Sequence, residues 1–302
     1  MKIYVNGCSH SKCHLDIGIV SWPLLVNLFI ENDYEDVGSE STLLKKSLLK
    51  KDESLTTYSK SKYVYDNHYR NVFLEFVKEK ENYFISEATD AKGNDSILYE
   101  TMESLRYLKK NGNLPDICII QWSGHSRNLM TPILQEHSNI LIPKEYVPQH
   151  KKSHNTQYRY CTPQNEFGNR LLLFEPSASL RTLNHMVILQ EYLKSINVNY
   201  IFINYFPLDN QIKNLPILSE LDLDKFVSYD KSTDPIFDGW IDKITKNKKY
   251  GLDLNKDKEG HPNINGMKLL YFRIINKINE IYSIGPIYTE DTIDKIIKPS
   301  IL

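Results

Sequence analysis

Short apolar segments alternate with amphipathic helical segments along this chain, and that alternation limits its possible folds more than any other feature. The clearest apolar segment is Ile117-Cys118-Ile119-Ile120, a continuous run of the kind found in parallel strands that are buried on both faces. Strands are predicted at Lys2–Val5, Tyr83–Ser86, Ile117–Ile120 and Tyr200–Tyr205, and helices at Trp22–Glu31, Asp95–Lys110, Ser179–Ser195 and Gly266–Ile281. This order predicts an α/β fold in which a parallel sheet is covered by helices.

The remaining segments complete one expected domain that spans residues 1–302. Two shorter helices are predicted at Leu218–Val227 and Trp240–Lys246. Asn94 or Asp95 is predicted to cap the start of the helix Asp95–Lys110. Residues 36–80 and 131–176 have no clear period, so they are predicted to be two insertions, the first with one or two helices and the second irregular. The expected architecture has three layers and a flavodoxin-like sheet.

Composition excludes several classes of function. The 302 residues carry a formal net charge of -1, which is too balanced for bulk electrostatic binding of nucleic acid. No apolar run approaches the ~20 residues that a membrane-spanning helix needs, and the apolar run at the start is too short for a signal peptide. The four cysteines form no CxxC pair, which favours a reducing compartment. We therefore expect a cytoplasmic protein without a nucleic-acid or membrane partner, and its oligomeric state stays open.

Three polar turns lie where the predicted strands end or where the last helix begins. Ser9 follows the first strand, Gly93-Asn94 follows the second, and His261 precedes the last helix. In parallel sheets, sites form at the carboxyl ends of the strands. A serine hydroxyl needs a base such as histidine to become a nucleophile, and backbone N–H groups at a helix start can hold a developing oxyanion. The pattern therefore indicates acyl transfer chemistry.

These residues resemble the motifs of the SGNH/GDSL hydrolases, and more narrowly the divergent SGNH-like proteins common in large phage genomes. Gly7-Cys8-Ser9 is similar to the turn of the nucleophilic serine, and the segment around Gly93 to the motif whose glycine donates an N–H to the oxyanion hole. The Asp257–His261 segment is similar to the motif that supplies the base. The resemblance implies a triad of Ser9, His261 and either Asp257 or Glu259, and an oxyanion hole formed by the N–H groups of Ser9 and Gly93.

The chain departs from the family pattern in two places. The asparagine that the family's third motif supplies to the oxyanion hole has no counterpart at the expected position, and Ser123, His125 or Asn94 could replace it, with Asn94 preferred. The carboxylates precede His261 by four and two residues, so the choice between Asp257 and Glu259 stays open. Residues expected to line the substrate site are His10, Trp122, Ser123, His125 and Arg127.

The expected function is that of a serine esterase that removes small acyl groups from a carbohydrate or a similar ester. Two alternatives are a non-catalytic module that binds a glycan or a protein, and an acyltransferase that uses the same triad. If the protein is phage-encoded, it would be found in the host cytoplasm or the virion.

A zinc site is the competing interpretation of the first turn. Cys8, His10, Cys13 and His14 are four possible ligands, but a tetrahedral structural site usually takes its ligand pairs from separated segments. We therefore expect Cys8 to pack under the sheet edge, and we expect neither a metal nor another cofactor.

Overall fold

The fold is taken from a computed structural model that describes part of the chain. The described residues are 1–8, 22–23, 25–26, 81, 83–88, 93–124, 128–130, 159–161, 175–245, 250–251, 261–283, 287–289 and 291. The predicted insertion at 36–80 lies outside them, as does most of the predicted helix Trp22–Glu31, of which Trp22, Pro23, Leu25 and Val26 are helical.

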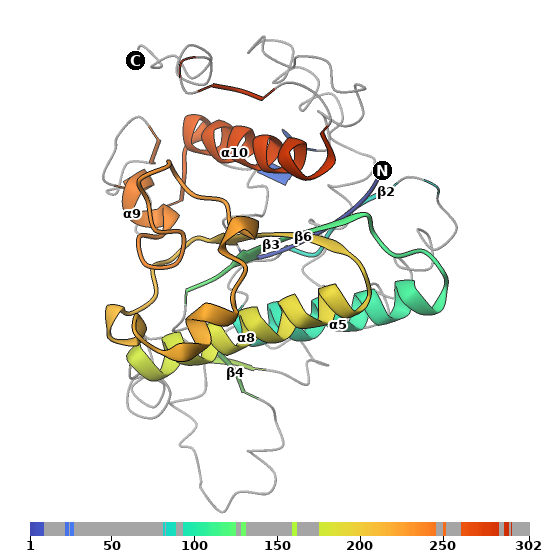
Figure 1. Cartoon of the computed structure of the whole chain (residues 1–302), viewed down its shortest axis with the longest axis horizontal. Coiled ribbons are helices and arrows are strands. Elements are labelled where there is room, and N and C mark those ends of the chain that lie inside the picture. Colours follow the sequence, from blue (N-terminus) through green and yellow to red (C-terminus); the bar gives the residue numbers. More distant parts are fainter. Residues whose placement is uncertain are drawn as a thin grey trace, which may run out of the picture.

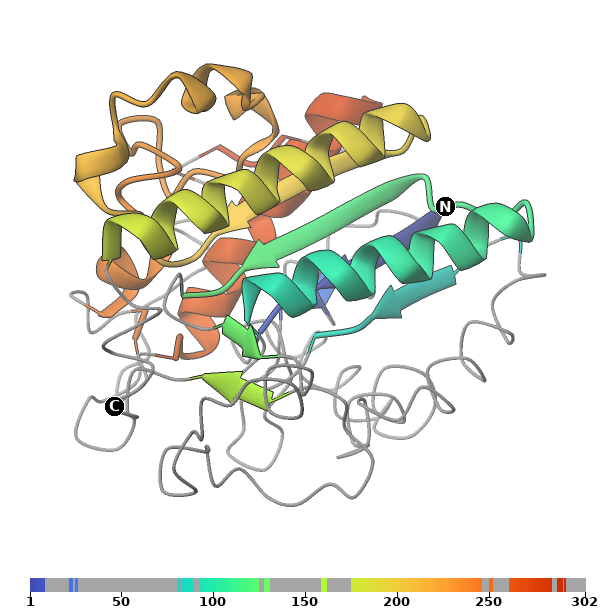
Figure 2. The same ribbon diagram turned by 90° about the horizontal axis from the view of Figure 1, so that it is seen from below.

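A four-stranded parallel sheet forms the centre of the molecule. The strands are β1 (Lys2–Asn6), β2 (Tyr83–Ser86), β3 (Ile117–Trp122) and β6 (Asn199–Asn204), and their order across the sheet is β2-β1-β3-β6. In the register of the pairs, Ile3 lies beside Phe84 and Ile117, and Ile117 beside Asn199. The strand arrows point to one edge of the sheet (Figure 2). The predicted parallel sheet is confirmed.

Helices cover both faces of this sheet (Figure 1). Helices α5 (Asn94–Lys110) and α8 (Glu175–Ser195) run side by side on one face, and α10 (Ile264–Tyr282) lies on the other. All six residues of β3 are buried, because alternate side chains enter the apolar layers on the two faces. The α/β class predicted from the sequence is therefore correct.

The predicted helix Leu218–Val227 is wrong. The segment forms two short 3-10 turns, η4 (Pro216–Glu220) and η5 (Leu223–Lys225). The Gln190 side chain bonds the backbone between them, donating from Nε2 to Glu220 O at 2.7 Å and accepting at Oε1 from Asp222 N at 2.8 Å. The carbonyl of Glu220 and the N–H of Asp222 therefore cannot form the hydrogen bonds of a continuous helix.

Beyond these turns the chain continues beside the sheet. Phe226 forms an isolated parallel bridge with Phe202 of β6, and Val227 N donates to Phe202 O at 2.8 Å. Phe226 and Val227 therefore extend the edge of the sheet next to β6, and we call this segment the short fifth strand position.

Two other predictions need correction. The cap of α5 is Gly93, which has extended backbone, and neither Asn94 nor Asp95 occupies that position because both belong to the helix. The segment 131–176 is not wholly irregular, since it contains β5 (Arg159–Cys161), which pairs antiparallel with β4 (Asn128–Met130), and the start of α8. The predicted helix at Trp240 is confirmed as α9 (Trp240–Thr245).

None of the helices within the described ranges is long and apolar enough to cross a membrane.

Candidate functional site

The carboxyl ends of the strands bring several polar residues to one edge of the sheet. Asn6 closes β1, Glu87 follows β2, and Ser123 follows β3, and all three side chains are buried. The carboxyl edge of a parallel sheet is where open α/β folds bind ligands. Ser9 and His10, which continue the chain from β1, lie outside the described residues.

The side chain of Asn6 fixes the turn after β1. Its Oδ1 accepts a hydrogen bond from Gly7 N at 2.8 Å, and its Nδ2 donates to Thr101 Oγ1 of α5 at 3.0 Å. Cys8 comes next, fully buried, with its sulfur 3.9 Å from Nε2 of Gln121 on β3. The chain that leads into Ser9 is therefore held by both the helix and the neighbouring strand.

A buried carboxylate lies directly after β2. Glu87 is only 1% exposed and accepts hydrogen bonds from Tyr4 Oη at 2.5 Å and from Ser104 Oγ at 2.6 Å. Hydroxyl donors offset much of the cost of burying such a group. Sequence reasoning missed Glu87, although a charged residue immediately after a predicted strand was a signal that could have identified it.

The start of α5 presents backbone donors at this edge. Gly93 has extended backbone (φ -88°, ψ 165°) and no side chain to cap the helix. The first N–H groups of a helix have no partner within it, and they carry the positive end of its dipole. A helix start of this kind can stabilise a negative charge, and the oxyanion role of Gly93 stays a prediction.

Asn94 links this helix start to the end of β3. Its Oδ1 accepts from Ser123 N at 2.7 Å, and its Nδ2 donates to Ser123 O at 3.1 Å and to Thr182 Oγ1 of α8 at 3.0 Å. The amide therefore holds the backbone of Ser123 from both sides and ties it to both helices.

Trp122 and Ser123 are both buried at the end of β3. The Trp122 ring is fully buried and packs edge-to-face on Phe202, with ring centroids 5.6 Å apart. Trp122 therefore contributes to the core at the end of β3. Ser123 is 1% exposed, and its Oγ has no hydrogen-bond partner among the described residues. The other predicted substrate residues after this strand, His125 and Arg127, lie outside the described residues.

His261 lies at the same edge of the sheet, at the start of α10. At the far end of this helix, the Tyr282 hydroxyl donates to Asp116 O and accepts from Asn199 Nδ2 at 3.2 Å. Asp116 and Asn199 stand at the amino ends of β3 and β6, so α10 ends at the amino edge and begins at the carboxyl edge.

The segment around His261 is held firmly. Its side chain is buried, with 8% of the residue exposed. Pro262 forms a bridge with Gly251, and Asn263 caps α10 by accepting from the backbone N–H groups of Asn265 at 2.9 Å and Gly266 at 3.0 Å. Asp257 and Glu259 lie outside the described residues.

An acid–base pair that sequence reasoning missed connects the two parallel helices. His185 Nε2 of α8 lies 3.3 Å from Asp95 Oδ1 in the first turn of α5. Burial lowers the pKa of His185, while the Asp95 carboxylate opposes that shift and Arg181 adds to it. The ring is therefore biased toward its neutral form. Neither residue stands at a strand end, so no sequence pattern brought them together.

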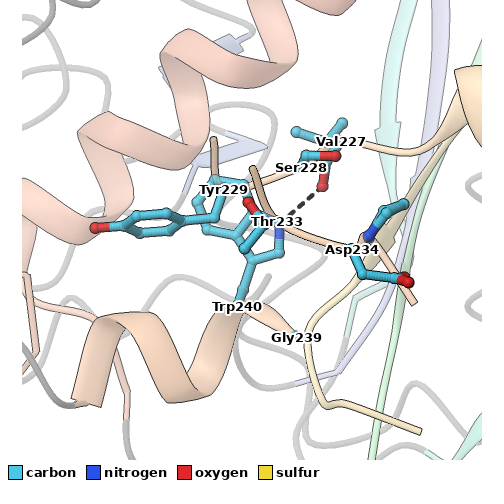
Figure 3. A pocket seen from close by; sticks show the side chains of 8 residues that line it. Val227, Ser228, Tyr229, Thr233, Asp234, Gly239 and Trp240 are labelled. Carbon is cyan, nitrogen blue, oxygen red and sulfur yellow. Dashed lines mark hydrogen bonds between the residues drawn. The ribbon is translucent and has the colours of Figure 1, made fainter. Parts of the chain in front are cut away.

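A small crevice lies between the short fifth strand position and α9 (Figure 3). It has about 160 Å³ of empty space, part of it open to solvent, and is lined by residues that include Val227, Tyr229, Thr233 and Trp240. The Trp240 indole donates to Val227 O at 2.9 Å and closes one side. Ligand sites usually have about 300–1,000 Å³, so this crevice is too small to be one by itself.

Comparisons with models of protein families, with curated proteins and with solved structures gave no significant match. The family resemblance therefore stays a prediction, based on the motifs quoted above.

Proposed function

We propose that the protein is a serine acyl hydrolase of the SGNH type, built on a flavodoxin-like sheet. Ser9 is the nucleophile, His261 is the general base, and Asp257 or Glu259 orients the imidazole. The observation that supports this most is the location of His261, the start of α5 and the end of β1 at a single edge of the parallel sheet. Residues from three distant parts of the sequence are thereby brought into one region.

The proposed reaction follows from the chemistry of these groups. His261 removes the proton from the Ser9 hydroxyl, whose oxygen attacks the carbonyl carbon of an ester. The N–H groups of Ser9 and Gly93 stabilise the oxyanion of the tetrahedral intermediate. The protonated imidazole returns its proton to the leaving alcohol, and an acyl-enzyme remains. Water, activated by the same imidazole, then releases the acid.

The proposed substrate is a small acyl group on a carbohydrate or a similar ester. Fluorophosphonate probes modify an activated serine whatever the leaving group, so they test the nucleophile without knowledge of the substrate. We expect the folded wild-type protein to gain the mass of one probe minus HF, because the serine oxygen displaces fluoride, and Ser9→Ala and His261→Ala to lose this labelling. Ser11→Ala, which changes a serine two residues from the proposed nucleophile, is the matched control and should label like the wild type.

Two results would count against this proposal. Labelling that persists in Ser9→Ala would place the nucleophile elsewhere, and a folded wild-type protein that never labels would favour a glycan- or protein-binding module. If labelling occurs, assays with acetylated glycans as donors and free glycans as acceptors distinguish hydrolysis from acyl transfer.

A further inference from the structure

The amide of Asn94 is fully engaged, which bears on which side chain could contact an oxyanion at this edge. Its two N–H groups donate to Ser123 O and Thr182 Oγ1, and its oxygen accepts from Ser123 N. An oxyanion could receive a hydrogen bond from Asn94 only by displacing one of these buried partners. The side chain preferred from the sequence therefore already has another task, which is to hold Ser123.

The side chain of Ser123, unlike that of Asn94, makes no hydrogen bond with the described residues. Its backbone N–H and C=O are both satisfied by Asn94, while its hydroxyl is buried and has no hydrogen-bond partner within the described part of the chain. A buried polar group without a partner costs about 1–3 kcal/mol, and native proteins contain few of them. A hydroxyl held in this state is free to donate to a charge that forms only during a reaction.

The location of Ser123 suits that task. It follows β3 and is bonded to the first residue of α5, so it is adjacent to the backbone donors of the helix start. Gln121, two residues earlier, contacts the sulfur of Cys8, the residue before the proposed nucleophile. The end of β3 that leads directly into Ser123 is therefore in contact with the Cys8 turn.

We propose that the Ser123 hydroxyl is the third donor of the oxyanion hole, and that Asn94 is a positioning residue that holds it there. This inference rests on the proposed acyl hydrolase function. The hydroxyl keeps its proton throughout and forms no covalent bond. It donates one hydrogen bond to the carbonyl oxygen as that oxygen becomes negative, and the bond is released when the carbonyl re-forms.

The test measures turnover and stability together, with p-nitrophenyl acetate as substrate and urea unfolding on the same samples. We expect Ser123→Ala to lower kcat about 10²–10³-fold with little change in KM, because the donor acts mainly in the transition state. Its free energy of unfolding should be unchanged or higher, since no hydrogen bond is lost. Ser179→Ala is the matched control: this buried hydroxyl accepts from Asp209 N at 2.9 Å, so its loss should reduce stability and leave kcat unchanged.

The role of Asn94 is tested by a double-mutant cycle. Asn94→Ala should lower kcat in the wild type and cause little further loss in the Ser123→Ala background, because both changes remove the same interaction. Equal losses in the two backgrounds would show that Asn94 acts independently of Ser123 and would overturn its positioning role.

The outcomes separate this inference from the function on which it rests. If the wild type labels with fluorophosphonate and Ser123→Ala retains its kcat, the hydroxyl is not an oxyanion donor and the hydrolase proposal survives. If the folded wild type neither labels nor turns over the ester, both proposals fail.

Discussion

Gly266, in the first turn of α10, is where a single atom has the clearest consequence. A Cβ at this position would lie 2.3 Å from the carbonyl oxygen of Tyr250 and 2.7 Å from Pro262 Cβ. The Tyr250 carbonyl also accepts the N–H of Asn263 at 2.8 Å, so it cannot move without disturbing the helix cap. Glycine here allows the segment that carries His261 to pack tightly against the chain at Tyr250.

Gly266→Ala should therefore destabilise the protein by about 1–3 kcal/mol, although alanine favours helices by about 1 kcal/mol over glycine. Under the proposed function it should also slow fluorophosphonate labelling, because the backbone beside His261 must shift. Urea unfolding and timed labelling measure the two effects. Gly112→Ala is the contrast, because a Cβ added at Gly112 would meet no neighbouring atom of the described residues within 4 Å. Only the left-handed backbone of Gly112 (φ +67°) opposes this substitution, at a cost of about 1–2 kcal/mol. Wild-type stability of Gly266→Ala would contradict the predicted clash.

For single residues, the sequence predicted which side chains lie at strand ends and helix starts, but it did not predict their hydrogen-bond partners. It predicted that His261, Gly93 and Asn94 would lie at strand ends or helix starts, and the structure puts all three there. It could not show that the amide of Asn94 is already bonded to Ser123 and Thr182, because those partners lie 29 and 88 residues away along the chain. The position of Glu87 after a strand was visible in the sequence, but its burial was not, since the Tyr4 hydroxyl that donates to its carboxylate is 83 residues distant.

Among the elements, the contact between α5 and α8 makes stability depend on pH. The pKa of His185 is lowered in the folded protein, so between that value and the ordinary histidine pKa of about 6.5 the unfolded chain binds a proton that the folded chain does not. The free energy of unfolding should then fall as the pH drops through this window, and the contribution is fully present above it.

His185→Gln should therefore lose less stability than the wild type when urea unfolding is compared at about pH 7.5 and about pH 5. Asp95→Asn is the matched variant with the opposite expectation. It removes the charge that opposes the shift, so the pKa of His185 should fall further and the loss on acidification should become steeper. Equal pH dependence in all three proteins would show that His185 does not titrate differently on folding.

The strongly periodic helices that end at Lys110 and Ser195 were predicted correctly, and among the described residues the predicted helix Leu218–Val227 is wrong because of a tertiary contact. Leu218–Val227 has the composition of a helix, but the side chain of Gln190, on another element, bonds the backbone at Glu220 and Asp222. Such competition is a tertiary effect, and no local pattern reveals it. The apolar run at Ile117 was read correctly because burial on both faces leaves a signal in the strand itself.

For the whole molecule, the sheet should protect its central thiol. Cys118 lies on β3, fully buried between two neighbouring strands, and burial raises the pKa of its thiol. A reagent can reach it only when the sheet opens. We expect alkylation of Cys118 in the native protein to be more than about 10³-fold slower than in the unfolded chain, since typical domain stabilities of 5 kcal/mol or more allow little opening.

Mass spectrometry of the Cys118 peptide across a urea series measures this protection, with the fully unfolded chain as the reference. Reactivity should rise in the same transition as the loss of far-ultraviolet circular dichroism. A rise at clearly lower urea would mean that the sheet opens locally before the molecule unfolds, which the central location of β3 does not predict.

The location of β1 within the sheet has a consequence for how the protein is made. This first strand lies between β2 and β3, so it gains its second neighbour only after residue 117 has been synthesised. Chains are made from the amino terminus, and pairings between distant segments form slowly. Ile3 and Val5 can pair with β2 once residue 86 has been made, but they lack their neighbours on β3 until more than a third of the polypeptide has been translated. The turn that leads to Ser9 is consequently synthesised long before Thr101 and Gln121, the side chains that hold it in the folded protein.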